Sequence, residues 1–132
     1  MSTPPPQLNA SELPVERYHE ISDATMDTML DNLEELLDGL GRREYEVEYS
    51  SGVLTLILGE HGTYVINKQP PNKQIWLSSP FSGPKRYDYD AEKDNWYYAR
   101  DGSAMGELLN EELSKALGQD VDLGLHAVSS LR

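Results

Sequence analysis

The sequence predicts an α+β fold, a two-layer α/β sandwich in which an N-terminal and a C-terminal helix pack on one face of an antiparallel sheet. Two observations predict it. Apolar residues recur at three- and four-residue steps in one segment near each end of the chain, as in amphipathic helices. Between these segments, short alternating or apolar runs are separated by turn residues, as in antiparallel strands. The sheet face without helices is then expected to meet water.

The two helices are predicted from their apolar stripes and their end signals. The first covers residues 14–40, and Gly41 supplies a stop signal after it. The second is expected to begin near Asp101 or Ser103, either of which is a suitable cap, and to end at Gly118. The apolar face of the first helix contains Met26, Met29, Leu30, Leu33, Leu36, Leu37 and Leu40, and that of the second Met105, Leu108, Leu109, Leu113 and Leu117.

Six strands are predicted between the helices, with turns at "SSG", "GEHG" and "PPN". The last two strands are expected to be joined by an acidic, mobile loop. The predicted strands cover residues 45–49, 53–58, 64–69, 73–78, 86–89 and 95–98.

The chain of 132 residues is long enough for one domain with one core. We expect a disordered N-terminal tail over residues 1–13, which are rich in proline and serine, a folded domain over 14–124, and a C-terminal tail over 125–132. Over residues 119–132, "QDVDLGLHAVSSLR", we expect the chain first to lie extended against the domain and then to form a loose end. Leu33, Leu56 and Leu109 are expected in the core.

Composition excludes several classes of protein. There are 23 acidic and 11 basic residues, a formal charge of −12, which argues against nucleic acid or an anionic membrane as partner. The absence of cysteine excludes disulfides, a thiolate nucleophile and a zinc–thiolate site. No apolar run is long enough to span a membrane. Because "MSTPPPQLNA" has neither an apolar nor an Arg-rich amphipathic pattern, we expect any targeting segment to be absent from this chain.

The first helix has an acidic stripe beside its apolar one. At about 100° per residue, six acids fall within a narrow sector and Glu35 lies just beyond it. No lysine or arginine occurs between Glu20 and Leu40. The stripe is either a solvated face or a docking surface for divalent cations or a basic partner; open carboxylates suit weakly bound, oxygen-preferring ions such as ferrous iron. Its six members are Glu20, Asp23, Asp27, Asp31, Glu34 and Asp38.

Residues near this stripe could extend it. The next strand carries Glu44, Glu46 and Glu48. His19 lies one turn before Asp23 and could complete a set of metal ligands. The alternative, which is more common for a lone surface histidine, is that it binds no metal.

A second surface follows from strand alternation. No acid occurs between Thr63 and Tyr87. In the fourth strand, Ile75 and Leu77 point to one face and Trp76 to the other. Around Trp76 we expect amides and the basic residues Lys68, Lys73 and Arg86. Trp76 either only covers its neighbours or, as we favour, is the centre of a protein-binding surface, because aromatic and arginine residues are enriched at binding hot spots.

No catalytic constellation is visible. The serines of "SSPFSG" lack a histidine partner, and the Gly and Lys spacing of "SGPKR" is not that of a phosphate-binding loop.

The amino-acid sequences of three segments resemble the frataxin family, and its eukaryotic members more than its bacterial ones. The segments are "GTYVINKQPPNKQIWLSSPFSGPKRYD", "NWYYARDG" and "LLNEELSKAL", and the similarity extends from about residue 18 to residue 123. The resemblance implies a sandwich of two helices on one face of an antiparallel sheet. It also implies a mitochondrial matrix protein that activates iron–sulfur cluster assembly by binding a cysteine desulfurase complex and its scaffold protein.

The resemblance further implies two sets of site residues. Iron, as Fe(II) or Fe(III), is expected to bind weakly at Glu20, Asp23, Asp27, Asp31, Glu34, Glu35, Asp38 and Glu46, with His19 as a further candidate. Partner proteins are expected to bind at Asn67, Gln69, Asn72, Lys73, Gln74, Trp76 and Arg86. No organic cofactor, nucleic acid or membrane is implied. The chain is expected to be mainly monomeric and able to form oligomers with iron.

An alternative function within the family is ferroxidase or iron-storage activity on the acidic stripe, besides iron delivery as a chaperone.

Two departures from the family pattern concern the last pair of strands and the residues just after it. "YDYDAEKDNW" is longer and more acidic than usual and has Tyr89 where tryptophan is expected, and Arg100 stands where many members have histidine.

Overall fold

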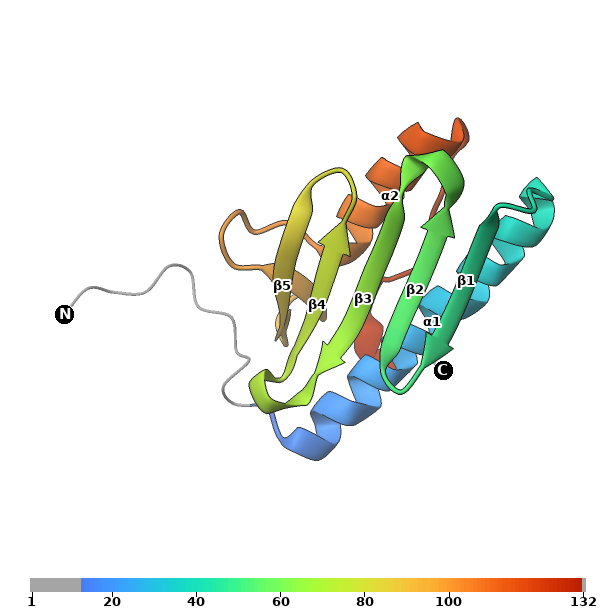
Figure 1. The fold of residues 1–132 in the computed structure, drawn as a ribbon. Coiled ribbons are helices and arrows are strands. Elements are labelled where there is room, and N and C mark those ends of the chain that lie inside the picture. The colour runs from blue at the N-terminus through green and yellow to red at the C-terminus, as the bar shows by residue number, and fades with distance from the viewer. Residues whose placement is uncertain (1–12, 132) are drawn as a thin grey trace.

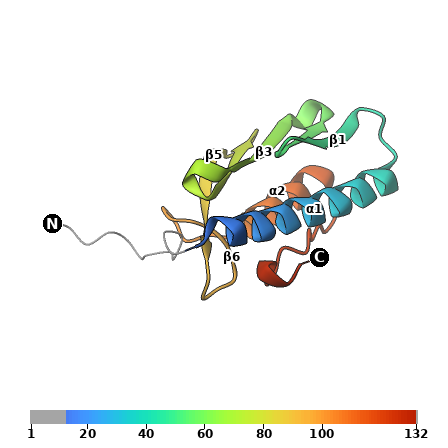
Figure 2. The same cartoon turned by 90° about the horizontal axis from the view of Figure 1, so that it is seen from below.

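A computed structural model describes residues 13–131, so the predicted N-terminal tail lies, apart from Leu13, outside the described residues. The chain forms α1 (Val15–Leu40), six strands and then α2 (Met105–Leu117). The strands are β1 (Tyr45–Ser50), β2 (Val53–Leu58), β3 (Thr63–Gln69), β4 (Gln74–Ser79), β5 (Gly83–Asp90) and β6 (Asn95–Tyr98). They form one antiparallel sheet in sequence order, and both helices cover the same face of it (Figures 1 and 2). The predicted fold class is confirmed.

The helix ends follow from local chemistry. At the end of α1, Gly41 adopts a left-handed conformation (φ 62°), and its N–H donates to the carbonyl of Leu37 at 3.0 Å. α2 begins later than predicted, at Met105, with Ala104 rather than Asp101 or Ser103 at the N-cap. Asp101 instead accepts hydrogen bonds from the backbone N–H and the hydroxyl of Ser103, which closes a turn ahead of the helix.

The core lies between the sheet and the helices. Leu33, Leu56 and Leu109, which we expected there, are each only 1% exposed. The fully buried Trp96 donates its indole N–H to the hydroxyl of Thr25 on α1 at 3.0 Å, which fixes the edge strand β6 against that helix.

The turn between β5 and β6 is short and held by hydrogen bonds, and the mobility that we expected there stays a prediction. Asp90, only 6% exposed, accepts hydrogen bonds from the backbone N–H groups of Glu92 and Lys93. Asp94 has a left-handed conformation (φ 51°), which aspartate tolerates better than most residues. The carboxylate of Asp90 therefore satisfies the backbone of a tight turn.

The C-terminal segment is part of the core, which corrects our expectation of a tail from residue 125 with a loose end. Leu125 is 2% exposed and Val128 is fully buried. A short 3-10 helix (Val128–Ser130) follows, and Ser129 donates two hydrogen bonds to the carboxylate of Asp94. Packing therefore continues past residue 124, where we expected the domain to end.

Candidate functional site

The open face of the sheet carries a row of polar side chains centred on Trp76. Strand register places Trp76 directly between Asn67 on β3 and Arg86 on β5, and Gln74 directly opposite Gln69. Ile75 and Leu77, which alternate with these residues on β4, are buried against the helices. Side chains that are paired across strands share a face, so these five form one surface, which we call the amide–tryptophan surface.

Trp76 is held in one orientation on this surface. The guanidinium carbon of Arg86 lies 4.5 Å from the centroid of the indole, a cation–π contact. The indole N–H donates to the side-chain oxygen of Gln74 at 2.8 Å. The amide nitrogen of Gln74 in turn donates to Asp88 at 3.0 Å. Because the half-buried ring has both a stacking and a hydrogen-bonding partner, it loses little conformational entropy on binding.

The strands under this surface are joined by Tyr18, which comes from α1. Its hydroxyl donates to the carbonyl of Gln74 at 2.7 Å and accepts from the backbone N–H of Gln69 at 3.1 Å. Burial raises the pKa of Tyr18 to about 12, so the phenol stays protonated and able to donate. The helix layer thereby fixes the ends of β3 and β4 from below.

Two lysines that we expected around Trp76 point elsewhere. Lys73 lies in the left-handed region (φ 54°) after a 3-10 turn (Pro70–Asn72), and its amine donates to the carbonyl of Leu13 at 2.7 Å. Lys68 has the strand parity of the buried Ile66 and points toward α1. Asn72 is exposed on the turn, at the end of the surface.

Lys68 also changes the metal site that we predicted near the start of α1. Its ammonium lies 2.6 Å from a carboxylate oxygen of Asp23 and 3.0 Å from Nδ1 of His19, and its side chain is only 10% exposed. An ammonium at this position competes with any cation for both ligands. Strand alternation puts Lys68 on the face of β3 that is covered by the helices, and this signal could have predicted the contact with Asp23. The helix pattern alone did not reveal it.

The remaining acids of the stripe are more open. Glu20 forms an exposed pair with Arg17 at 3.6 Å. Asp27, Asp31, Glu34 and Asp38 are exposed, and within residues 13–131 none of them has a basic partner within 4 Å. We call these four residues the open stripe.

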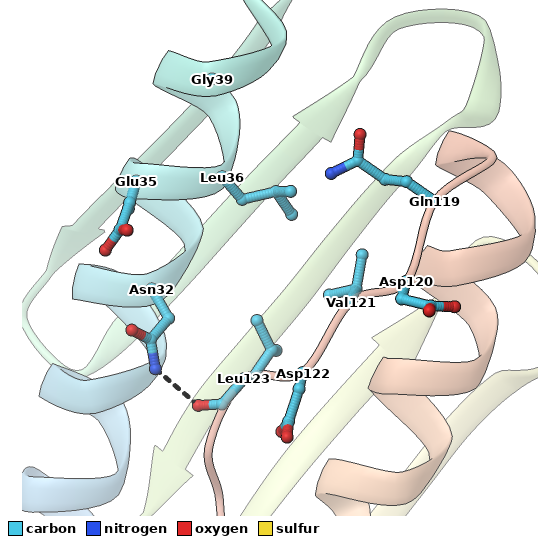
Figure 3. A pocket seen from close by; sticks show the side chains of 9 residues that line it. All are labelled: Asn32, Glu35, Leu36, Gly39, Gln119, Asp120, Val121, Asp122 and Leu123. Atoms are coloured by element: carbon cyan, nitrogen blue, oxygen red, sulfur yellow. Dashed lines mark hydrogen bonds between the residues drawn. The ribbon is translucent and has the colours of Figure 1, made fainter.

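Glu35 and Glu46 lie apart from the open stripe. Glu35 lines a groove of about 350 Å³ between α1 and the segment after α2, which also carries Asp120 and Asp122 (Figure 3). The amide of Asn32 donates to the carbonyl of Leu123 at 2.7 Å across this groove. Glu46 is exposed and alternates with the partly buried Val47 of β1, so it belongs to the open face of the sheet.

The carboxylates are therefore spread over the surface. Among the described residues, no group of three histidine, aspartate or glutamate side chains lies close enough together to hold one metal ion. The open stripe can attract cations through its summed charge and bind them through one or two carboxylates at a time. No helix in residues 13–131 has the length and apolarity needed to cross a bilayer.

Comparisons with known proteins agree with this architecture. A family model described as a frataxin-like domain matches residues 11–119. The mitochondrial frataxin homologue of Schizosaccharomyces pombe is 47% identical over 105 residues, which cover 80% of this chain and 66% of that protein. The chain thus spans slightly less than two thirds of this relative's length.

Solved structures give the same result. A structure of yeast frataxin has a TM-score of 0.70 and 45% identity, and covers 89% of this chain and 96% of its own. Trimeric frataxin from Saccharomyces cerevisiae complexed with ferrous iron has a TM-score of 0.66 and 47% identity. The match covers 76% of this chain and 88% of that chain. That protein is trimeric, whereas we expected this chain to be mainly monomeric.

Further curated relatives from Dictyostelium discoideum and Saccharomyces cerevisiae are also named as mitochondrial frataxins, which supports the expected mitochondrial localisation. The matched residues include both helices and all six strands. The chain belongs to the frataxin family.

Proposed function

We propose that this chain is an iron-binding activator of iron–sulfur cluster assembly in the mitochondrial matrix. It docks on a complex of a cysteine desulfurase with a scaffold protein, accelerates the transfer of persulfide sulfur to the scaffold, and delivers ferrous iron. The observation that carries the proposal is the fixed position of Trp76 on the amide–tryptophan surface. Amides, an indole and a guanidinium are groups that recognise a protein surface, and none of them is a general base at neutral pH.

The proposal is supported by the separation of the open stripe on α1 from the amide–tryptophan surface on the sheet. The open stripe gives α1 a negative field that suits ferrous iron or a basic patch of the partner. The structure of the yeast relative complexed with ferrous supports iron binding in the family. Docking through the amide–tryptophan surface leaves the carboxylates of α1 free to carry an ion to the assembly.

The proposal is tested with Trp76→Ala in a reconstituted desulfurase–scaffold complex, with sulfide production and cluster formation as readouts. We expect stimulation to be lost while the thermal unfolding midpoint stays close to that of the wild type, because Trp76 lies outside the core. Phe81→Ala is the matched control, since Phe81 is 53% exposed but lies on the turn between β4 and β5. Full stimulation by Trp76→Ala would contradict the proposal.

A second candidate function is oxidation or storage of ferrous iron on the open stripe. It is favoured by the exposure of Asp27 and Asp31, which lie one helical turn apart without a basic partner in the described part of the chain. It predicts saturable, oxygen-dependent oxidation that is lost in Asp27→Asn/Asp31→Asn and retained in the equally charged control Glu92→Gln/Glu107→Gln. An oxidation rate equal to that in buffer would exclude this function. Sedimentation with and without iron gives the oligomeric state in the same samples.

A further inference from the structure

A depression of about 380 Å³ lies beside the amide–tryptophan surface, where β6 ends and leaves one end of β5 uncovered. Its lining includes Gln74, Arg86 and Asp88 from the open face of the sheet. Tyr98, the last residue of β6, and Arg100, just after that strand, also line it. Two arginines therefore face one depression next to Trp76, in a protein that is otherwise strongly acidic.

Neither arginine forms an ion pair in the part of the chain that the structure describes. Arg86 and Arg100 are both exposed, and in residues 13–131 neither has a carboxylate within 4 Å. The two guanidinium groups are thus available to an external anion.

The one carboxylate inside the depression is kept away from them. Asp88 accepts a hydrogen bond from the amide nitrogen of Gln74 at 3.0 Å, while the oxygen of the same amide accepts from Trp76 at 2.8 Å. Gln74 therefore fixes Asp88 and Trp76 together. The guanidinium carbon of Arg86 lies 4.5 Å from the centroid of the indole, and a cation–π contact of this kind uses none of the N–H groups as donors to a carboxylate. Lys85 contributes little, because its ammonium donates to the carbonyl and the hydroxyl of Ser82.

We propose that this depression receives a carboxylate of the partner protein, an aspartate or glutamate side chain held between Arg86 and Arg100 beside Trp76. The inference rests on the proposed docking function and adds the chemistry of one partner group. A carboxylate is opposite in charge to the two guanidinium groups and can accept bidentate hydrogen bonds from them. A polyanion such as nucleic acid would instead be repelled by the net charge of −12.

The first test measures the affinity of the reconstituted desulfurase–scaffold complex for Arg100→Gln and Arg86→Lys at two salt concentrations. We expect roughly five- to tenfold weaker binding for Arg100→Gln, with a reduced salt dependence. Arg86→Lys keeps the charge but loses the planar fork, and should weaken binding to a similar extent. Arg43→Gln, which removes an exposed arginine in the turn after α1, is the control and should bind like the wild type.

The second test identifies the partner group. Arg100→Lys places an amine in the depression, and a carbodiimide should then couple it directly to a carboxylate of the complex. We expect mass spectrometry to find a cross-link between the new amine and an aspartate or glutamate of the partner, and none from the control Arg43→Lys. If neither variant cross-links to an acidic residue, the carboxylate assignment is overturned.

The outcomes separate this inference from the docking function. If Trp76→Ala abolishes binding but Arg86→Lys and Arg100→Gln bind like the wild type, the docking function stands and the carboxylate site is excluded. If all three variants bind normally, both are excluded.

Discussion

Replacing Asp94 with asparagine should loosen the C-terminal segment from the turn between β5 and β6. The carboxylate accepts three hydrogen bonds: from the backbone N–H of Ser129 at 2.9 Å, from its hydroxyl at 2.6 Å, and from the hydroxyl of Tyr89 at 2.7 Å. Tyr89 stands where the family pattern led us to expect tryptophan. The hydroxyl of this tyrosine supplies one of the three hydrogen bonds to Asp94. Asparagine tolerates the left-handed backbone (φ 51°) as well as aspartate does, so the substitution isolates the carboxylate.

The magnitude follows from these three bonds. A hydrogen bond to a charged group contributes about 1.5–3 kcal/mol when it is well buried. The asparagine side chain would still offer one carbonyl oxygen, and Asp94 is only half-buried, so water screens part of the loss. We expect Asp94→Asn to lower the free energy of unfolding by about 1–2 kcal/mol. The midpoint temperature should then fall by roughly 3–8 °C for a domain of this size.

The pH dependence gives an independent readout. Burial raises the pKa of Asp94, but the hydrogen bonds from Ser129 and Tyr89 outweigh it and hold the pKa below its ordinary value. A carboxyl with a lower pKa in the folded state stabilises the fold above its unfolded pKa, and this contribution is lost as the pH falls through the folded pKa. The difference between wild type and Asp94→Asn should therefore be full at neutral pH and shrink in the acidic range, below about pH 4.

The assay is urea unfolding of the wild type, Asp94→Asn, Ser129→Ala and the double variant. Because Asp94 and Ser129 share their hydrogen bonds, the two losses should be less than additive in this cycle. Equal stability of Asp94→Asn and wild type at neutral pH would refute the reasoning. A loss that stays constant down to acidic pH would show that the carboxylate charge is not its cause.

Three further changes test other parts of the structure. Leu109→Ala should lower the free energy of unfolding by about 2–5 kcal/mol because it opens a cavity in the core, and urea unfolding measures it. Glu112→Gln should cost about 1–2 kcal/mol at neutral pH, since Glu112 accepts hydrogen bonds from the hydroxyls of Tyr64 and Ser79, both at 2.7 Å. Burial raises the pKa of Glu112 but its hydrogen bonds hold it lower, so this loss should fade in acid; a constant loss would contradict it. Lys68→Gln should bind ferrous iron more tightly in calorimetric titration, because it frees Asp23; unchanged affinity would show that Asp23 is not a ligand.

The sheet face could be predicted from the sequence because strand alternation is a local property. Once residues 74–78 are assigned to a strand, Ile75 and Leu77 must share one face and Trp76 the other. Burial in the structure follows this parity. The hydrogen bond from Trp76 to Gln74 could have been considered too, since residues two apart in a strand lie on one face.

The pairing of the acidic stripe could not be predicted from the helix alone. Helical periodicity places Asp23 and Asp27 in one sector, but Lys68 reaches Asp23 from a position 45 residues away, on β3. Similarly, Val121, Leu123 and Leu125 alternate with Asp122 and Gly124, as core-facing residues do in a strand. In the structure this segment is not part of a strand, and the three side chains pack directly into the core. Such contacts depend on how elements are placed in the fold, which no local pattern specifies.

The arrangement of the two surfaces bears on how one partner assembly could use both. The open stripe lies on the helix layer and Trp76 on the opposite face of the sheet, so a flat partner could not cover both. The helix layer meets the edge of the amide–tryptophan surface at one corner, where the start of α1, ahead of the open stripe, meets the 3-10 turn Pro70–Asn72. Tyr18 and Leu13 contact β3, β4 and Lys73 there, and Asn72 projects from the turn. A partner assembly that contacts both the amide–tryptophan surface and the acidic helix would therefore have to reach around this corner, past the ion pair between Lys68 and Asp23.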